Sequence, residues 1–117
     1  MGSDRALTVQ ARLEEALADG GDRYALADVM AQIDSGEAHL WAFERSAVVT
    51  KFIDEPAGRT FFYWLAGGDL DEIKRMEPRM SEWAKAHGCN RKMLAGRAGW
   101  QRALGWQRVG VVLAEVI

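Results

Sequence analysis

Basic and aromatic side chains alternate in the last third of the chain, where the residue types suit binding of a ligand or partner. Residues 83–114 contain six Lys and Arg and three Trp but no carboxylate. Arg97 lies three residues before Trp100, and Arg102 lies four before Trp106. Arginine and tryptophan dominate binding hot spots. We therefore expect these four residues to form an interaction surface on a short helix. The alternative is that both Trp anchor the helix to a sheet while both Arg point to solvent.

The other candidate chemical groups have ordinary structural explanations. Cys89 has no neighbouring base and is expected to be a small core residue, and His87 ends a helix, where an imidazolium stabilises the dipole. His39 and Glu44 are five residues apart, which places them on opposite faces of a regular strand. A single Cys and two distant His exclude an internal disulfide and a zinc spacing. We therefore identify no catalytic residue and no metal site.

Composition predicts one packed domain over residues 1–117. The chain of 117 residues and 13.0 kDa is 49% hydrophobic with five Trp, which excludes general disorder. It has no apolar run long enough to cross a bilayer, and its first residues lack the apolar segment that a signal peptide contains. We expect a cytoplasmic protein, no membrane contact, and residues 1–5 that are disordered or derived from a tag.

The charge is unevenly distributed along the chain. Residues 1–82 carry a net charge of −7 and residues 83–117 a net charge of +5, which gives the overall −2. A basic surface with exposed Trp would suit single-stranded nucleic acid. We place this interpretation behind the simpler one, in which acidic and basic faces neighbour one another in a single fold.

Two amphipathic helices are predicted to open the chain. Apolar residues repeat at helical spacing over residues 6–18 and 25–35, and Gly36 is placed for a left-handed C-cap. Residues 39–44 and 46–53 are rich in β-branched and aromatic residues and meet at a short polar junction, which predicts an antiparallel hairpin.

A buried strand, a long helix, and further strands are predicted to follow. Residues 54–59 contain Pro and Gly for a reversal, and residues 60–66 are nearly all apolar, which indicates a strand buried on both faces. One helical face continues through 69–87, with Pro78 expected to kink it near Glu77 or divide it into two helices.

The remaining elements are a short strand at 91–96, parallel to the strand before the long helix, a short helix at 99–105, and a final strand at 109–117. The fold class is therefore α/β (α+β), a mixed sheet of about five strands with helices on both faces, in the order α-α-β-β-β-α-β-α-β.

This order resembles that of the GCN5-related N-acetyltransferases over about residues 22–117. The segment WAKAHGCNRKMLAG resembles the end of that family's long helix and its next strand, and GWQRALGWQRVG resembles its short helix and following turn. The chain is also similar to small phage and prophage proteins of this fold. The matching residues are Trp83, Ala84, Gly88, Cys89, Gly96, Arg97, Gly99 and Trp100.

The resemblance implies a cofactor corner that this sequence alters. Active members bind the acetyl-CoA pyrophosphate with Q/R-x-x-G-x-G/A before the long helix, whereas this chain reads LAGGDLDE there. Ala66, Gly67 and Gly68 would bind the cofactor if any residues do, but three carboxylates follow at once and would repel an anion. The family's Tyr general acid is absent from the short-helix region. Tyr63 and Trp64 lie on the central strand, and we expect core packing, with the alternative that one faces an acyl or peptide groove.

These departures favour a catalytically inactive acetyltransferase-like protein of phage or prophage origin, without cofactor. We expect it to be a virion-associated structural or protein-binding module, with a protein partner or homo-oligomer formed through the edge that the C-terminal strand leaves open. The alternative is an acyl-CoA-dependent N-acyltransferase with an atypical cofactor loop, using acetyl-CoA, in which Arg97 or Arg102 reaches the phosphates. A small nucleic-acid-binding module is the third interpretation.

Overall fold

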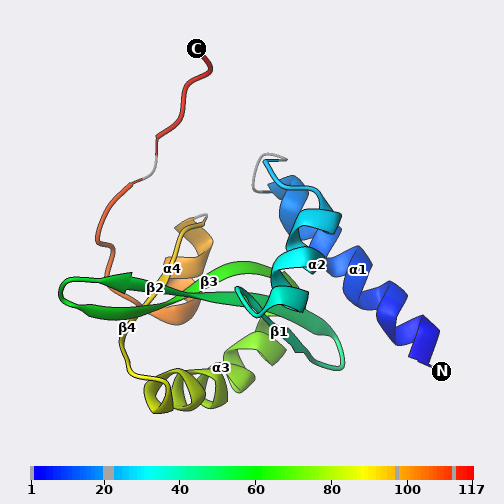
Figure 1. Ribbon diagram of the computed structural model, residues 1–117, viewed down its shortest axis with the longest axis horizontal. Helices are drawn as coiled ribbons and strands as arrows, with labels where there is room; N and C mark the ends of the chain where they lie inside the picture. Colours follow the sequence, from blue (N-terminus) through cyan, green and yellow to red (C-terminus); the bar gives the residue numbers. More distant parts are fainter. Residues whose placement is uncertain (1, 20–22, 97, 112) are drawn as a thin grey trace.

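In the residues that the structure describes, the protein is a mixed α+β fold in which four helices pack around a single sheet. The computed structural model describes residues 2–19, 23–96, 98–111 and 113–117 (Figure 1). The elements are α1 (Gly2–Asp19), α2 (Leu26–Ser35), β1 (His39–Ala42), β2 (Ser46–Glu55), β3 (Gly58–Gly68), α3 (Leu70–Ala86), β4 (Cys89–Leu94) and α4 (Ala98–Leu104).

The sheet has the strand order β1-β2-β3-β4. β1, β2 and β3 are antiparallel neighbours, and β4 lies parallel to β3. This confirms the predicted hairpin at residues 39–53 and the parallel pair that flanks the long helix. β4 pairs with β3 only from Arg59↔Cys89 to Tyr63↔Leu94, so the last five residues of β3 extend past β4.

The prediction of about five strands is wrong for the part of the chain that is described, because residues 109–111 and 113–117 form no strand. Figure 1 shows this segment leaving α4 as extended chain and ending away from the sheet. The sequence alternates as a strand does, but a strand also needs a neighbouring backbone to accept and donate its hydrogen bonds. Local pattern does not specify that neighbour.

Each face of the sheet carries its own hydrophobic core. The first is mainly aliphatic and is formed by α1, α2 and the strands; its buried members are Val9, Leu13, Ala16, Leu17, Val29, Ala38, Ala47, Val49 and Leu65. The second is rich in aromatic residues and includes α3; its buried members are Val48, Phe61, Tyr63, Ile73, Met80 and Ala84. The alternation of Ala47, Val48 and Val49 between the two cores is the period of two that a strand covered on both faces requires.

A β-bulge separates the two aromatic residues of the central strand. Val49 pairs with Leu65 and Thr50 with Tyr63, so Trp64 is the extra residue. Tyr63 is buried in the aromatic core, while Trp64 packs against the aliphatic core next to Leu65. The two side chains therefore lie on opposite faces of the sheet.

α3 is a single continuous helix from Leu70 to Ala86, although Pro78 lies within it. The predicted division into two helices does not occur. Asp69 is the N-cap, and its side chain accepts a hydrogen bond from the backbone N–H of Glu72, as their spacing predicts.

The two N-terminal helices also follow the predicted pattern. α2 ends at the left-handed Gly36, as predicted. α1 begins at Gly2, so residues 2–5, which we expected to be disordered or tag-derived, form its first turn.

Candidate functional site

The corner between β3 and α3 is the place where the resemblance puts a cofactor phosphate, and its glycines contact the protein's own backbone. A Cβ atom added at Gly67 would lie 2.3 Å from the carbonyl oxygen of Arg12 in α1. A Cβ atom at Gly68, which has a φ of +105°, would lie 2.3 Å from the carbonyl oxygen of Arg45 in the β1–β2 turn. Both glycines are therefore required by close packing within the chain, and Ala66 pairs with Val48 of β2 beside them.

The carboxylates after these glycines turn inward and bind the β1–β2 turn. Glu72 is 5% exposed and accepts hydrogen bonds from the Ser46 hydroxyl and, at 2.9 Å, from the Arg45 backbone N–H. The Arg45 guanidinium Nε lies 3.2 Å from Asp69 Oδ2 and 3.9 Å from Glu72 Oε2. The hydrogen bond from the Ser46 hydroxyl has the largest effect in holding the pKa of Glu72 below its ordinary value. The hydrogen bond from the Arg45 backbone N–H and the charge of the Arg45 guanidinium lower this pKa further. The carboxylate is therefore ionised at neutral pH.

A second arginine attaches α1 to the same turn. The Arg12 guanidinium donates to the carbonyl oxygens of Phe43 and Glu44, at 3.3 and 3.1 Å. Together with the contact between its own carbonyl and Gly67, this places α1 across the corner. The guanidinium groups of Arg12 and Arg45 and the backbone N–H groups of Asp69 and Glu72 are thus already engaged by carbonyl and carboxylate oxygens.

The electrostatics of the corner oppose an anion. The N-terminal turn of a helix attracts negative charge, but here Asp69 already accepts from Glu72 N, and Glu72 fills the adjacent buried position. Asp71, also in the first turn, is exposed. Arg45 compensates one of these three negative charges, so the corner is still acidic after its ion pairs form.

A second polar cluster, which the sequence analysis did not identify, lies between β3, α3 and β4. The carboxylate of Glu77 accepts from the Tyr63 hydroxyl at 3.1 Å, from the Ser81 hydroxyl and from Lys92 Nζ. Lys92 also donates to Ser81 at 3.0 Å and lies 4.9 Å from the centroid of the Trp106 ring. We call Tyr63, Glu77, Ser81 and Lys92 the Glu77 cluster.

The Glu77 cluster is arranged to be stable, and its groups are poor acid–base catalysts at neutral pH. Burial alone would raise the pKa of Glu77, but hydrogen bonds from Lys92 and Ser81 and the charge of Lys92 hold it below its ordinary value. Burial, and then the charge of Glu77, raise the pKa of Tyr63. A general base works best with a pKa near the operating pH, whereas the pKa of Glu77 is held low and that of Tyr63 is raised. The cluster binds β4 and α3 to the central strand.

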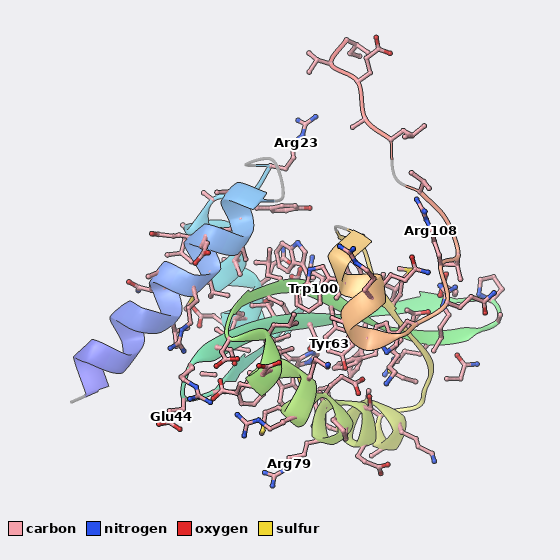
Figure 2. The ribbon with its side chains drawn as sticks, turned by 180° about the vertical axis from the view of Figure 1, so that it is seen from behind. Arg23, Glu44, Tyr63, Arg79, Trp100 and Arg108 are labelled. Carbon is pink, nitrogen blue, oxygen red and sulfur yellow. The ribbon has the colours of Figure 1, made fainter. Side chains whose placement is uncertain are left out.

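The predicted interaction surface is only partly displayed. Trp100 and Trp106 are half-buried and pack against the aromatic core, and the Trp106 ring lies 5.6 Å from that of Tyr63. Arg102 is exposed on α4, whereas Arg97 lies outside the described residues. Trp100 on α4 and Trp106 after it therefore both pack toward the sheet, and Figure 2 shows the labelled Trp100 on α4.

The basic residues of β4 are engaged within the chain. Arg91 lies 3.1 Å from Glu55 and also donates to Thr60, and Lys92 is paired with Glu77. Internal carboxylates therefore offset part of the positive charge that the nucleic-acid interpretation requires.

The histidines and the cysteine stay apart from these two sites. His39 is packed against Phe52 and Trp83, and burial lowers its pKa. Glu44 is exposed at the turn, where Figure 2 shows it at the edge of the molecule. His87 Nδ1 lies 2.7 Å from the carbonyl oxygen of Trp83, and burial raises the pKa of the Cys89 thiol. None of these residues forms a nucleophile–base pair in the structure.

Helical spacing was the signal that would have found part of the Glu77 cluster. Glu77 and Ser81 are four residues apart and share one helix face. Tyr63 and Lys92 join them through the parallel pairing of β3 and β4, which no local pattern reveals.

Among the described residues, no three His, Cys, Asp or Glu side chains gather closely enough to hold a metal ion, and no helix has the length and apolarity that a bilayer crossing demands. Comparison of the chain with protein-family models, curated proteins and solved structures found no match.

Proposed function

We propose that this protein is a catalytically inactive acetyltransferase-like module that binds other protein chains, as a structural protein of phage or prophage origin in the host cytoplasm or the virion. The element order and the short motifs of α3, β4 and α4 support the resemblance. The closed β3–α3 corner is the observation that carries the inactive assignment.

Two physical features of the corner oppose cofactor binding. The first is steric, because Gly67 and Gly68 are in contact with the backbones of α1 and the β1–β2 turn. The second is electrostatic, because Asp69 and Glu72 occupy the positions at the helix N-terminus that a phosphate would take. The pKa values of Glu77 and Tyr63, which are shifted away from neutral pH, support the proposed inactivity.

Calorimetric titration with acetyl-CoA and with CoA tests this proposal. We expect no saturation in the micromolar range. Saturation there would contradict the inactive assignment and favour the acyl-CoA-dependent N-acyltransferase, in which case loss of turnover in Arg102→Ala would identify the phosphate contact.

The variant Glu72→Gln separates the two features of the corner. It removes a negative charge while keeping an acceptor for Ser46 and Arg45, and the contacts of Gly67 are unchanged. We expect this variant not to bind acetyl-CoA, since the backbone contacts still fill the corner. Micromolar binding by Glu72→Gln would show that the steric argument is wrong. Asp71→Asn, at an exposed position of the same turn, is the matched control for a change of one charge.

Salt dependence tests the nucleic-acid interpretation. A protein that neutralises several phosphates loses affinity steeply as salt rises. We expect little binding of single-stranded DNA at moderate salt, because Arg91 and Lys92 are paired with Glu55 and Glu77. Tight binding with a steep salt dependence would favour the third interpretation over a protein-binding role.

A further inference from the structure

The segment after α4, residues 107–111 and 113–117, exposes large apolar side chains; we call it the C-terminal arm. Val109, Val111, Leu113 and Val116 are 71%, 63%, 87% and 92% exposed, and Ile117 is fully exposed. Soluble domains rarely leave several large apolar side chains in sequence fully open to water.

The arm has the composition and alternation of a β-strand. Val109, Val111 and Leu113 occupy alternate positions, which share one face of an extended chain, and the segment has no Pro. In the described part of the arm no backbone group belongs to a sheet. In the described part of the arm, the apolar side chains therefore have no surface to pack against, and the backbone has no neighbouring strand to form hydrogen bonds with.

The start of the arm is fixed beside β4. Trp106 packs against Tyr63, and Lys92 of β4 lies over its ring. Gly105, with a φ of +71°, ends α4 and turns the chain into Trp106. From this anchored point the arm extends away from its own sheet, and Figure 2 shows Arg108 on this departing chain.

The same molecule presents an open sheet edge. Within the described part of the chain, β4 is an edge strand of the sheet and pairs only with β3. Lysine and arginine often protect such an edge from pairing. Here Arg91 binds Glu55 and Thr60, and Lys92 binds Glu77 and Ser81, so both side chains are held against their own chain.

Charge does not oppose pairing of the arm with the edge. The arm carries one positive side chain, Arg108, and one negative, Glu115. Arg91 and Lys92 of β4 are already paired with Glu55 and Glu77. The match between the arm and the edge therefore lies in backbone pairing and in burial of the apolar side chains.

We propose that the C-terminal arm adds as a fifth strand to β4 of a second copy of this chain, in a reciprocal exchange that forms a two-fold symmetric dimer. Each chain supplies both an unpaired arm and an unpaired sheet edge. In a reciprocal exchange the arm of each copy pairs with β4 of the other, so no arm or β4 edge is left to recruit a third copy. A different protein would satisfy only one of them. The dimer does not depend on the proposed function, because cofactor binding and association are measured separately.

Sedimentation equilibrium of the full chain, from micromolar to hundreds of micromolar concentration, tests the proposal. We expect a reversible monomer–dimer equilibrium. Val111→Pro removes a backbone donor and Leu113→Asp puts a charge on the apolar face, so each is expected to weaken association at least about tenfold. Val111→Thr keeps the β-branched shape and is the matched control that retains the dimer. A monomer at every concentration, or a dimer unchanged in Val111→Pro, would overturn the proposal.

Isotope-filtered NMR on a mixture of labelled and unlabelled chains detects contacts between copies and so identifies which strand the arm pairs with. We expect contacts between the arm of one copy and β4 of the other. Arm-to-β4 contacts within one chain would show that the arm pairs with its own sheet, and dimer contacts confined to other surfaces would show a different interface. Either result would refute the exchange.

Discussion

The β3–α3 corner and the C-terminal arm differ in whether their side chains and backbone groups have interaction partners within the chain. In the corner, Glu72, Ser46 and Arg45 satisfy one another, and Gly67 lies against α1. In the arm, apolar side chains such as Leu113 and Val116 face water. The comparison shows that a corner suited by position to a ligand is closed by the chain itself, while the segment that lacks partners is suited to another chain. Binding by this protein is therefore expected at its sheet edge, and the corner is expected to determine stability.

Gly67→Ala gives the largest expected effect. The new Cβ would lie 2.3 Å from the Arg12 carbonyl oxygen, and backbone cannot move aside as a flexible side chain does. We expect the free energy of unfolding, measured with urea, to fall by about 3 kcal/mol. Gly99→Ala is the control, since nothing lies within 4 Å of its Cβ position and it is in a helix. It should raise the free energy of unfolding by about 0.5 kcal/mol. Equal effects of the two variants would mean that the corner is loosely packed.

Glu72→Ala gives the next largest effect. It leaves the buried Ser46 hydroxyl and the Arg45 N–H without their acceptor. We expect the free energy of unfolding to fall by about 2 kcal/mol. Glu82→Ala, at an exposed position of the same helix, should change it by less than about 0.5 kcal/mol. A similarly small change at Glu72 would show that its hydrogen bonds add little stability.

Acid should weaken the corner, and the sign follows from the pKa of Glu72. Its pKa in the folded protein lies below the ordinary value of 4.5, so the folded state binds fewer protons than the unfolded state. The resulting stability is complete above the unfolded pKa and is lost as pH falls through the folded pKa. Urea unfolding from neutral to acidic pH should therefore show a smaller loss for Glu72→Gln than for the unaltered chain. The pKa of Glu77 is also lowered, so some loss remains in the variant. If the free energy of unfolding depended on pH identically in both proteins, the lowered pKa of Glu72 would be contradicted.

Val111→Pro should have the smallest effect on monomer stability. Val111 is 63% exposed and lies outside the helices and strands, so the substitution removes little buried surface and no hydrogen bond of a helix or strand. At concentrations where the chain is monomeric, we expect the free energy of unfolding to change by less than about 0.5 kcal/mol. A larger loss would indicate that the arm packs on its own domain, and would remove the contrast between the two regions.

The elements with strong local signals were predictable. Periodicity located both N-terminal helices, Gly36 fixed the end of α2, and the turn at Arg45 was placed correctly between β1 and β2. Pro78 predicted either a kink near Glu77 or a division into two helices, and the division does not occur, because α3 continues through it. The pattern of residues 109–117 is that of a strand, but residues 109–111 and 113–117 pair with no other strand in the structure, so the strand count was wrong.

The candidate sites were less predictable, because they depend on contacts between distant segments. Acidic residues at Asp69 and Glu72 were recognised as unfavourable for a phosphate, but their partner Arg45 lies more than 20 residues away. The Glu77 cluster joins three elements, and the role of Gly67 became clear only with α1 in place.

The sequence by itself determined the helices, the hairpin, the uneven charge and the acidic start of α3, because each depends on residues within a few positions of one another. Only the tertiary structure decided that Gly67 and Gly68 contact backbone, that Lys92 meets Glu77, and that residues 109–111 and 113–117 stay unpaired. The physical reason is that strand pairing and close packing depend on which distant segment of the chain lies next to a residue. Local periodicity does not specify that segment.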